Sequence, residues 1–298
     1  MITFFTCPKS FKNSHIAVIQ RNAITSWKRL HSQLEIILMG NEEGVKEIGQ
    51  DFNLKHVPEI SCNEFGTPFV NDIFNKAQNV ATLHLMCYVN TDIILMSDFM
   101  RAIHKISSLK GNFLMVGRRS DLEIKNILSF NEDIEEELRK RVLKARVCSP
   151  RGIDYFIFPK GLWGDIPAFA LGRFWWDNWL LYRARSLNAK LIDATSVITA
   201  VHQKHDYSNL TLDHLSHLPE QLWFQNPEAR KNYALGGNKK RYFIQINDAT
   251  HQLTPQGIRR SWRGTLYLYS FWDTYISPWV DRLKRRMAQP SSPHFVTN

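Results

Sequence analysis

Short apolar runs alternate with helical patterns through the first third of the chain. Runs typical of buried strands occupy residues 2–6, 34–39, 54–57 and 83–89. Helical spacing of apolar residues falls between them, at 16–27, 42–52 and 71–80. This alternation predicts an α/β fold, in which helices flank both faces of one mainly parallel, Rossmann-like sheet.

The alternation continues to about residue 208 and then stops. Further helices are predicted at residues 96–109, 131–146 and 172–186, and further strands at 113–117, 153–158 and 189–200. We therefore expect a single α/β domain over residues 1–208. The polar, His-rich remainder, residues 209–298, is expected to be a C-terminal extension with a helical part.

The charge balance narrows the class of partner. The 298 residues carry a formal net charge of +10, which favours anionic partners. Their hydrophobic content of 44% is ample for a core. We find no zinc-finger, RRM or basic-zipper pattern, so nucleic acid is not the expected partner.

Four widely spaced cysteines predict reduced thiols and a cytoplasmic protein. No apolar run approaches the roughly 20 residues of a membrane helix.

Residues 90–92, Asn-Thr-Asp, interrupt the most apolar strand. A carboxylate buried at a strand end needs a partner, and Asp92 is a suitable ligand for Mg²⁺ or Mn²⁺. Because Asn and Asp also favour turns, a plain strand-ending turn is an equal alternative for these three residues.

Ligands of parallel sheets bind outside the carboxyl ends of the strands. Thr6 and Pro8 follow the first strand, Asn41 follows the second, and Asn90 follows the fourth. We expect these side chains to converge on one crevice.

Asp177 stands among tryptophans, with Trp175 and Trp176 before it and Trp179 after it. Partial desolvation would raise the pKa of this carboxyl group and make it a stronger base once ionised. The aromatic faces also suit sugar rings. The alternative is an ordinary acidic residue in the first turn of a helix.

His202 and His205 follow a predicted strand, three residues apart. A neutral imidazole can complete a site for Mn²⁺ or a similar ion. Most loop histidines bind nothing, however, and this spacing alone is a weak motif.

Together these pieces resemble the GT-A-fold glycosyltransferases, in the broad nucleotide-sugar-dependent group related to family two. The resemblance covers residues 1–208, with the donor part at about 1–95 and the acceptor part at 96–208. It implies Asp92, with His202 or His205, as ligands of Mn²⁺ or Mg²⁺ on the diphosphate of a UDP- or GDP-sugar. It also implies Asp177 as the base. The chain departs from the family pattern at Asn90 and Asn178, where carboxylates are usual.

The resemblance also implies roles for residues that the pattern alone leaves open. Arg118 or Arg173 would stabilise the leaving phosphates, although surface positions suit both, and Arg119 is at least as well explained as a surface residue. The acceptor, a glycan or lipid-linked molecule, would meet a wider set of side chains. That set is Asp154, Arg173, Trp175, Trp176 and Asn178. Direct displacement would invert the anomeric carbon. A non-catalytic nucleotide- or sugar-binding module and a basic nucleic-acid-binding protein are the alternatives.

Residues 257–288 are predicted to include a helix with one apolar stripe, and the range is rich in aromatic and basic residues. Such a helix can lie on an anionic membrane, which would make the protein peripheral on the inner face of a membrane. It can equally pack on the catalytic domain.

Overall fold

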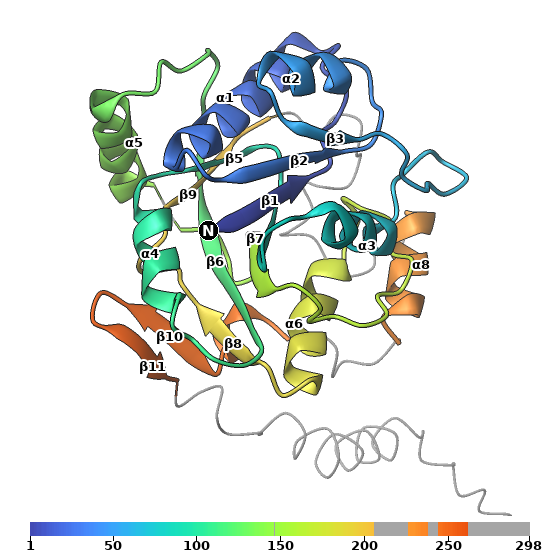
Figure 1. Cartoon of the computed structure of the whole chain (residues 1–298), viewed down its shortest axis with the longest axis vertical. Coiled ribbons are helices and arrows are strands. Elements are labelled where there is room, and N and C mark those ends of the chain that lie inside the picture. The colour runs from blue at the N-terminus through green and yellow to red at the C-terminus, as the bar shows by residue number, and fades with distance from the viewer. Residues whose placement is uncertain (146, 206–225, 238–243, 262–298) are drawn as a thin grey trace, which may run out of the picture.

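The computed structural model describes residues 1–145, 147–205, 226–237 and 244–261. One sheet forms the centre of this part of the chain, and helices cover both of its faces (Figure 1). The expected α/β class is thereby confirmed. None of the helices in these ranges combines the length and the apolar character that crossing a bilayer requires.

The elements follow one another in the order that the hydrophobic pattern predicts over most of the chain. The strands are β1 (Ile2–Thr6), β2 (Glu35–Met39), β3 (Lys55–Val57), β4 (Leu85–Val89), β5 (Ile93–Leu95), β6 (Phe113–Leu122), β7 (Ile153–Pro159), β8 (Lys190–Asp193), β9 (Ala200–Gln203), β10 (His251–Thr254) and β11 (Gly257–Arg260). The helices are α1 (Ser14–Leu30), α2 (Val45–Asp51), α3 (Val70–Val80), α4 (Asp98–Ile106), α5 (Glu132–Lys144), α6 (Trp176–Ser186), α8 (Pro227–Leu235) and the 3₁₀ turn η3 (Ile246–Asp248).

The main path of the sheet runs β11-β10-β8-β6-β7-β4-β1-β2-β3, with β5 and β9 branching from it through β6. Strands β4, β1, β2 and β3 are parallel, so their carboxyl ends lie at one edge. Strand β7 runs antiparallel between β4 and β6 and reverses the local direction. The sheet is therefore mainly parallel with antiparallel insertions.

Two apolar cores lie on the opposite faces of the sheet. Alternate residues of each strand point to opposite faces, so Phe5 and Tyr88 pack with α3 and α6. Their neighbours Phe4 and Cys87 pack with α1, α2 and α4. Continuous burial on both faces explains why these strands are unbroken apolar runs rather than alternating ones.

Three boundaries differ from the sequence prediction. Strand β6 continues past residue 117 to Leu122, and the strand predicted over 189–200 divides into β8 and β9. Residues 257–260, predicted as the start of a helix, form β11 in a hairpin with β10, since Gly257 adopts φ +124° at the turn.

The expected division at residue 208 does not divide the sheet, because β10 continues it beside β8. The rest of the predicted basic helix, 262–288, lies outside the described residues.

Gly117 allows β6 to cross the centre of the sheet. The register between β6 and β7 shifts between Val116 and Arg118, around this glycine. A Cβ on Gly117 would lie 1.9 Å from Oη of Tyr155 and 2.9 Å from its Cζ. The ring of Tyr155 therefore fills the space that any other side chain at residue 117 would need.

We expect Gly117→Ala to lower the free energy of unfolding by about 1–3 kcal/mol, as overpacking of a core does. The hydroxyl of Tyr155 is buried and has no hydrogen-bond partner among the described residues. Tyr155→Phe alone should therefore cost little stability, and it should restore part of the loss in the double variant. Denaturant unfolding of all four proteins measures the coupling, and purely additive losses would contradict this account.

Candidate functional site

The turn at residues 90–92 joins two strands of different sheet branches. Strand β4 ends at Val89, and the N–H of Ile93 donates to the carbonyl of Asn90 at 3.1 Å, which closes the turn. The buried hydroxyl of Thr91 lies 2.8 Å from that of Thr6 at the end of β1. The two hypotheses for residues 90–92, a strand-ending turn and a metal ligand, are therefore compatible, because the turn itself presents Asp92 at the carboxyl edge of the sheet.

Pairing of β5 with β9 brings the histidines to Asp92. The two strands are antiparallel, with Ile93 opposite His202, so a residue more than 100 positions away lies beside the turn. The amide of the buried Gln203 side chain reinforces the join, since it donates to the carbonyls of Ile19 at 2.8 Å and Asp92 at 3.2 Å.

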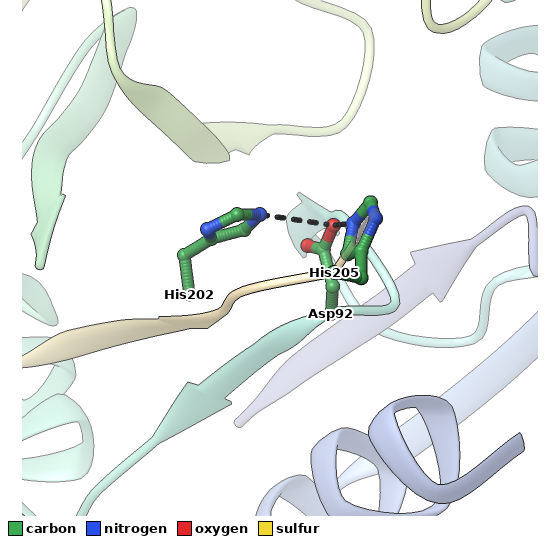
Figure 2. Close-up of side chains that lie close together, drawn as sticks. All are labelled: Asp92, His202 and His205. Atoms are coloured by element: carbon green, nitrogen blue, oxygen red, sulfur yellow. Dashed lines mark hydrogen bonds and ion pairs between the residues drawn. The ribbon is translucent and has the colours of Figure 1, made fainter. Parts of the chain in front are cut away.

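The Asp92 carboxylate lies between two imidazoles (Figure 2). Its Oδ2 is 3.5 Å from Nε2 of His202 and 3.2 Å from Nε2 of His205. One ligand atom from each residue falls within 4.8 Å of the others. The second oxygen, Oδ1, is buried with no hydrogen-bond partner among the described residues. A divalent cation fits this set, because it could engage the carboxylate, whose Oδ1 has no partner among the described residues, together with two imidazoles.

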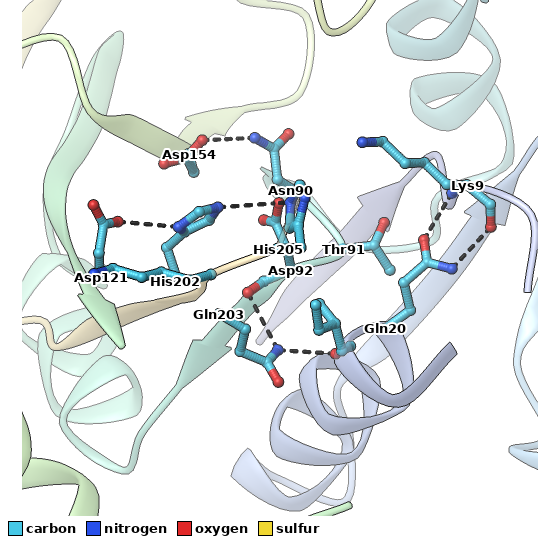
Figure 3. Close-up of polar contacts among 12 residues, drawn as sticks. Lys9, Gln20, Asn90, Thr91, Asp92, Asp121, Asp154, His202, Gln203 and His205 are labelled. Carbon is cyan, nitrogen blue, oxygen red and sulfur yellow. Dashed lines mark hydrogen bonds and ion pairs between the residues drawn. The ribbon is translucent and has the colours of Figure 1, made fainter. Parts of the chain in front are cut away.

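A chain of hydrogen bonds extends from this cluster across the sheet (Figure 3). Asp121 on β6 lies 3.0 Å from Nδ1 of His202, an arrangement that orients the other ring nitrogen toward Asp92. The guanidinium of Arg119 donates to Asp121 at 3.1 Å and to Asp154 at 2.8 Å. Asn90 then donates its side-chain amide to Asp154 at 2.7 Å.

The charges of this network stabilise one another. Burial would raise the pKa of Asp92, but the charge and hydrogen bonds of His202 and His205 outweigh it and hold that pKa well below its usual range. Burial likewise disfavours protonated His202, but Asp92 and Asp121 raise its pKa to about 9. A cation binding to the imidazole of His202 must therefore displace a proton.

Asp177 lies in the first turn of α6, two positions after a strained residue. Trp175 adopts φ +91°, a left-handed conformation that is rare for an aromatic residue, and its side chain does not cap the helix. Oδ1 of Asp177 accepts the N–H of Asn178 at 2.8 Å. Burial raises the pKa of Asp177 to about 6; the backbone donor of Asn178 opposes the shift, and the charge of Asp154 adds to it. The charge of Asp154, which belongs to the network, therefore contributes to the pKa of Asp177.

Most of the tryptophan surface is used in the core. Trp176 is 6% exposed and packs edge-on against Tyr88 and at a tilt against Phe156, each at 5.4 Å between ring centroids. Trp179 packs against Phe169 at 5.4 Å. Of the three tryptophans around Asp177, Trp175 is the one that is partly exposed as a residue, although its ring packs against Tyr233.

Two other predicted acceptor residues are engaged in the protein. The guanidinium of Arg173 donates twice to the carboxylate of Glu228, with both distances 2.7 Å. The buried amide of Asn178 donates to the carbonyl of Ile244 at 2.9 Å. These contacts give both side chains a structural role at the edge of the site.

Of the remaining predicted donor residues, Pro8 and Asn41 follow strands, and Arg118 lies within β6. Pro8 is buried after β1, and Asn41 is exposed after β2. The backbone N–H of Arg118 donates to Thr195 at 3.0 Å, and its buried Nε has no hydrogen-bond partner in the described ranges.

The sequence prediction missed Asp121 and explained Arg119 as a surface residue, because it ended β6 too early. The structure shows alternation after Gly117, with Ser120 and Leu122 buried and Arg119 and Asp121 partly exposed. It also missed Lys9, whose backbone N–H and carbonyl both bond the buried side chain of Gln20. Figure 3 shows the Lys9 side chain extending toward Asn90.

No protein-family model and no curated protein sequence matches the chain. Solved structures that resemble it include S. aureus TarS 1-349 in complex with UDP-GlcNAc, at TM-score 0.32 and 11% identity over 43% of this chain and 37% of that one. Another is glucosyl-3-phosphoglycerate synthase from Mycobacterium tuberculosis with Mn²⁺, UDP-glucose and phosphoglyceric acid, at TM-score 0.49 and 12% identity over 80% of both chains. At these TM-scores and identities, neither a family nor an activity is carried over to this chain from either structure.

We expect the cluster of Asp92, His202 and His205 to bind Mn²⁺ more tightly than Mg²⁺, because imidazole is a poor ligand for Mg²⁺. Asp121→Asn should weaken Mn²⁺ binding about 10–100-fold, as loss of a partner that orients a histidine ligand does. Titration calorimetry measures both affinities, and the Mn²⁺ affinity should rise with pH toward about 9 as His202 loses its proton.

Glu123→Gln is the matched control, since Glu123 is a solvent-exposed carboxylate just past the end of the same strand. Equal Mn²⁺ affinities for wild type, Asp121→Asn and Glu123→Gln would rule out this metal site.

Proposed function

We propose that this chain is a glycosyltransferase that moves a sugar from a nucleotide-sugar donor, a UDP- or GDP-sugar, to an acceptor hydroxyl. The observation that carries the proposal is the Asp92, His202 and His205 cluster at the carboxyl edge of the sheet. Burial raises the pKa of Asp177, and the charge of Asp154, a member of the network beside the cluster, adds to that shift. Displacement of a nucleoside diphosphate requires charge stabilisation of the leaving group and a base for the acceptor hydroxyl, and we assign these roles to the cluster and to Asp177.

The donor would bind with its diphosphate beside the cluster. Asp92, His202 and His205 would hold Mn²⁺ or Mg²⁺, which supplies charge neutralisation for the leaving diphosphate when it is bound. Lys9, in the loop after β1, would add a positive charge, since its side chain extends toward Asn90 (Figure 3). Thr6, Pro8, Asn41 and Arg118 stay candidates for the nucleotide. Asn90 would orient Asp154 toward sugar hydroxyls rather than bind metal, since its amide already donates to that carboxylate.

Asp177 would act as the base on the acceptor hydroxyl. At pH 7 a carboxyl group with a pKa near 6 is mostly ionised, yet it is a stronger base than an ordinary aspartate. Attack by that hydroxyl opposite the leaving diphosphate would invert the anomeric carbon. Trp175 offers the partly exposed aromatic surface for the acceptor, a glycan or lipid-linked molecule. A cytoplasmic location and contact with an anionic membrane stay predictions, because the basic tail from residue 262 is outside the described residues.

The direct test is to incubate the protein with a panel of UDP- and GDP-sugars and Mn²⁺, and to measure released nucleoside diphosphate. Turnover that depends on both donor and metal supports the enzyme over a non-catalytic binding module. Saturable donor binding without turnover on any acceptor supports the module instead.

Asp177→Asn should lower transfer by about 10²–10⁴-fold, the usual contribution of a general base. Donor and Mn²⁺ affinities should stay within about twofold of wild type, because the amide keeps the shape of the carboxyl group. Wild-type turnover should fall as pH drops below about 6, where Asp177 takes up a proton. Asp165→Asn, which changes an exposed carboxylate before the same helix, is the control. Transfer by Asp177→Asn within a few-fold of wild type would exclude the base assignment.

The same substitution should stabilise the protein at neutral pH. The raised pKa means that the ionised form of Asp177 opposes folding, so the protonated group contributes fully below about pH 3.8 and the contribution is lost as pH rises through 6. Asp177→Asn should therefore be more stable than wild type above pH 6, by up to about 3 kcal/mol, and similar to it near pH 4. Thermal unfolding at both pH values measures the difference. A variant less stable than wild type at pH 7 would contradict the burial of this charge.

A further inference from the structure

Helix α8 comes from the region where the hydrophobic pattern is least informative, yet it contacts the segment that leads into α6. Residues 170–175 form this segment, which we call the entry loop, and it ends two positions before Asp177. Helix α8, orange in Figure 1, is the partner of the entry loop at both of its ends.

Asn232 bonds both ends of the entry loop with one side chain. Its Oδ1 accepts the N–H of Ala170 at 2.8 Å, and its Nδ2 donates to the carbonyls of Ala170 at 3.0 Å and Phe174 at 3.1 Å. The side chain is 1% exposed, so water does not compete for these bonds. A buried amide with three backbone bonds fixes the distance between the two ends of the loop.

A second contact holds the middle of the entry loop. Glu228, one turn before Asn232, is 6% exposed and receives both bonds of the Arg173 guanidinium. Its other oxygen accepts the amide of Asn63 at 2.6 Å. This pairing favours a fixed geometry, because separating Arg173 from Glu228 would leave a buried carboxylate without its counter-charge.

The backbone that these contacts restrain is strained. Trp175 adopts φ +91°, and its ring packs edge-on against Tyr233 of α8 at 5.5 Å. A left-handed conformation at a bulky residue persists only where the surroundings hold it in place. The bond from Asn232 to the carbonyl of Phe174 acts on the residue directly before this strain.

We propose that Asn232 is a positioning residue that holds the entry loop in the conformation that places Asp177 against the acceptor. The proposal rests on the proposed transferase function. It assigns no contact with substrate to Asn232. It also gives Arg173 and Glu228 the same positioning role, in place of a contact between Arg173 and the sugar.

The test compares Asn232→Leu, which keeps the side-chain size and removes the three bonds, with Glu228→Gln, which weakens the second contact. Asn232→Leu should lower kcat by about 10–100-fold, since small displacements of a reacting group have effects of that size. The KM for the donor and the Kd for Mn²⁺ should stay within about twofold. Hydrogen exchange at the amides of residues 170–178 should accelerate, while exchange in β4 stays unchanged. Glu228→Gln should show the same pattern more weakly.

Two controls separate positioning from a general loss of stability. Lys231→Ala changes the neighbour of Asn232, which makes only a long, exposed ion pair with Glu64 at 3.7 Å, and should leave kcat unchanged. Ile48→Ala removes a core side chain of α2 on the opposite face of the sheet and should lower Tm without lowering kcat.

A folded Asn232→Leu with kcat within twofold of wild type overturns the proposal. So does a parallel loss of kcat, donor affinity and Mn²⁺ affinity. If Asn232→Leu does not fold, Glu228→Gln is judged by the same criteria. If wild type turns over no donor in the panel, the proposed function fails. Hydrogen exchange then still tests whether Asn232 restrains the entry loop. Acceleration confined to residues 170–178 supports it, and unchanged exchange there refutes it.

Discussion

The antiparallel pairing of β5 with β9 is the contact on which the rest of the candidate site depends. Strand β5 has only three residues, but its register sets His202 opposite Ile93 and so beside Asp92. The same β9 lies parallel to β6, which places Asp121 opposite His202. One short strand pair thus brings the turn after β4, the end of β6 and both histidines together. Because a register slip of one residue would turn His202 to the other face, the apolar burial of Ile94 and Val201 also specifies the site.

Alternating charge explains the unusual residue at position 90. The network runs from Asp92 through protonated His202 to Asp121, Arg119 and Asp154, so each carboxylate has a cationic neighbour. Asn90 comes next, 2.7 Å from Asp154. A carboxylate at residue 90 would face that of Asp154 with no cation between them, whereas an amide donates to it. The amide at residue 90 therefore fits its surroundings. Under the proposed function, the two histidines would supply the ligands that a second carboxylate would otherwise supply.

Prediction from the sequence worked where local patterns determine the structure. Apolar runs located β1, β2 and β4. The polar interruption after the last of these runs singled out Asp92, whose role as a metal ligand stays a prediction. The failures share one physical cause, which is pairing between distant segments. The polar extension of β6 to Asp121 pairs with β9, and β10 pairs with both β8 and β11. Helix α8 shows no strong amphipathic pattern, since its buried positions include polar Glu228 and Asn232, whose partners lie more than 50 residues away.

The tryptophans around Asp177 show how packing in the core reaches the chemistry. Their number suggested a platform for sugar rings, but Trp176 and Trp179 are buried against other aromatic rings. Their effect on Asp177 comes through the exclusion of water, and burial is the largest cause of its raised pKa. A carboxyl group kept partly dry destabilises the folded state whenever it is ionised, and the strain at Trp175 adds to that cost. Local instability of this kind is tolerated where the surrounding contacts are strong. Here the contacts include the hydrogen bonds of Asn232, on a helix distant in sequence, to Ala170 and Phe174.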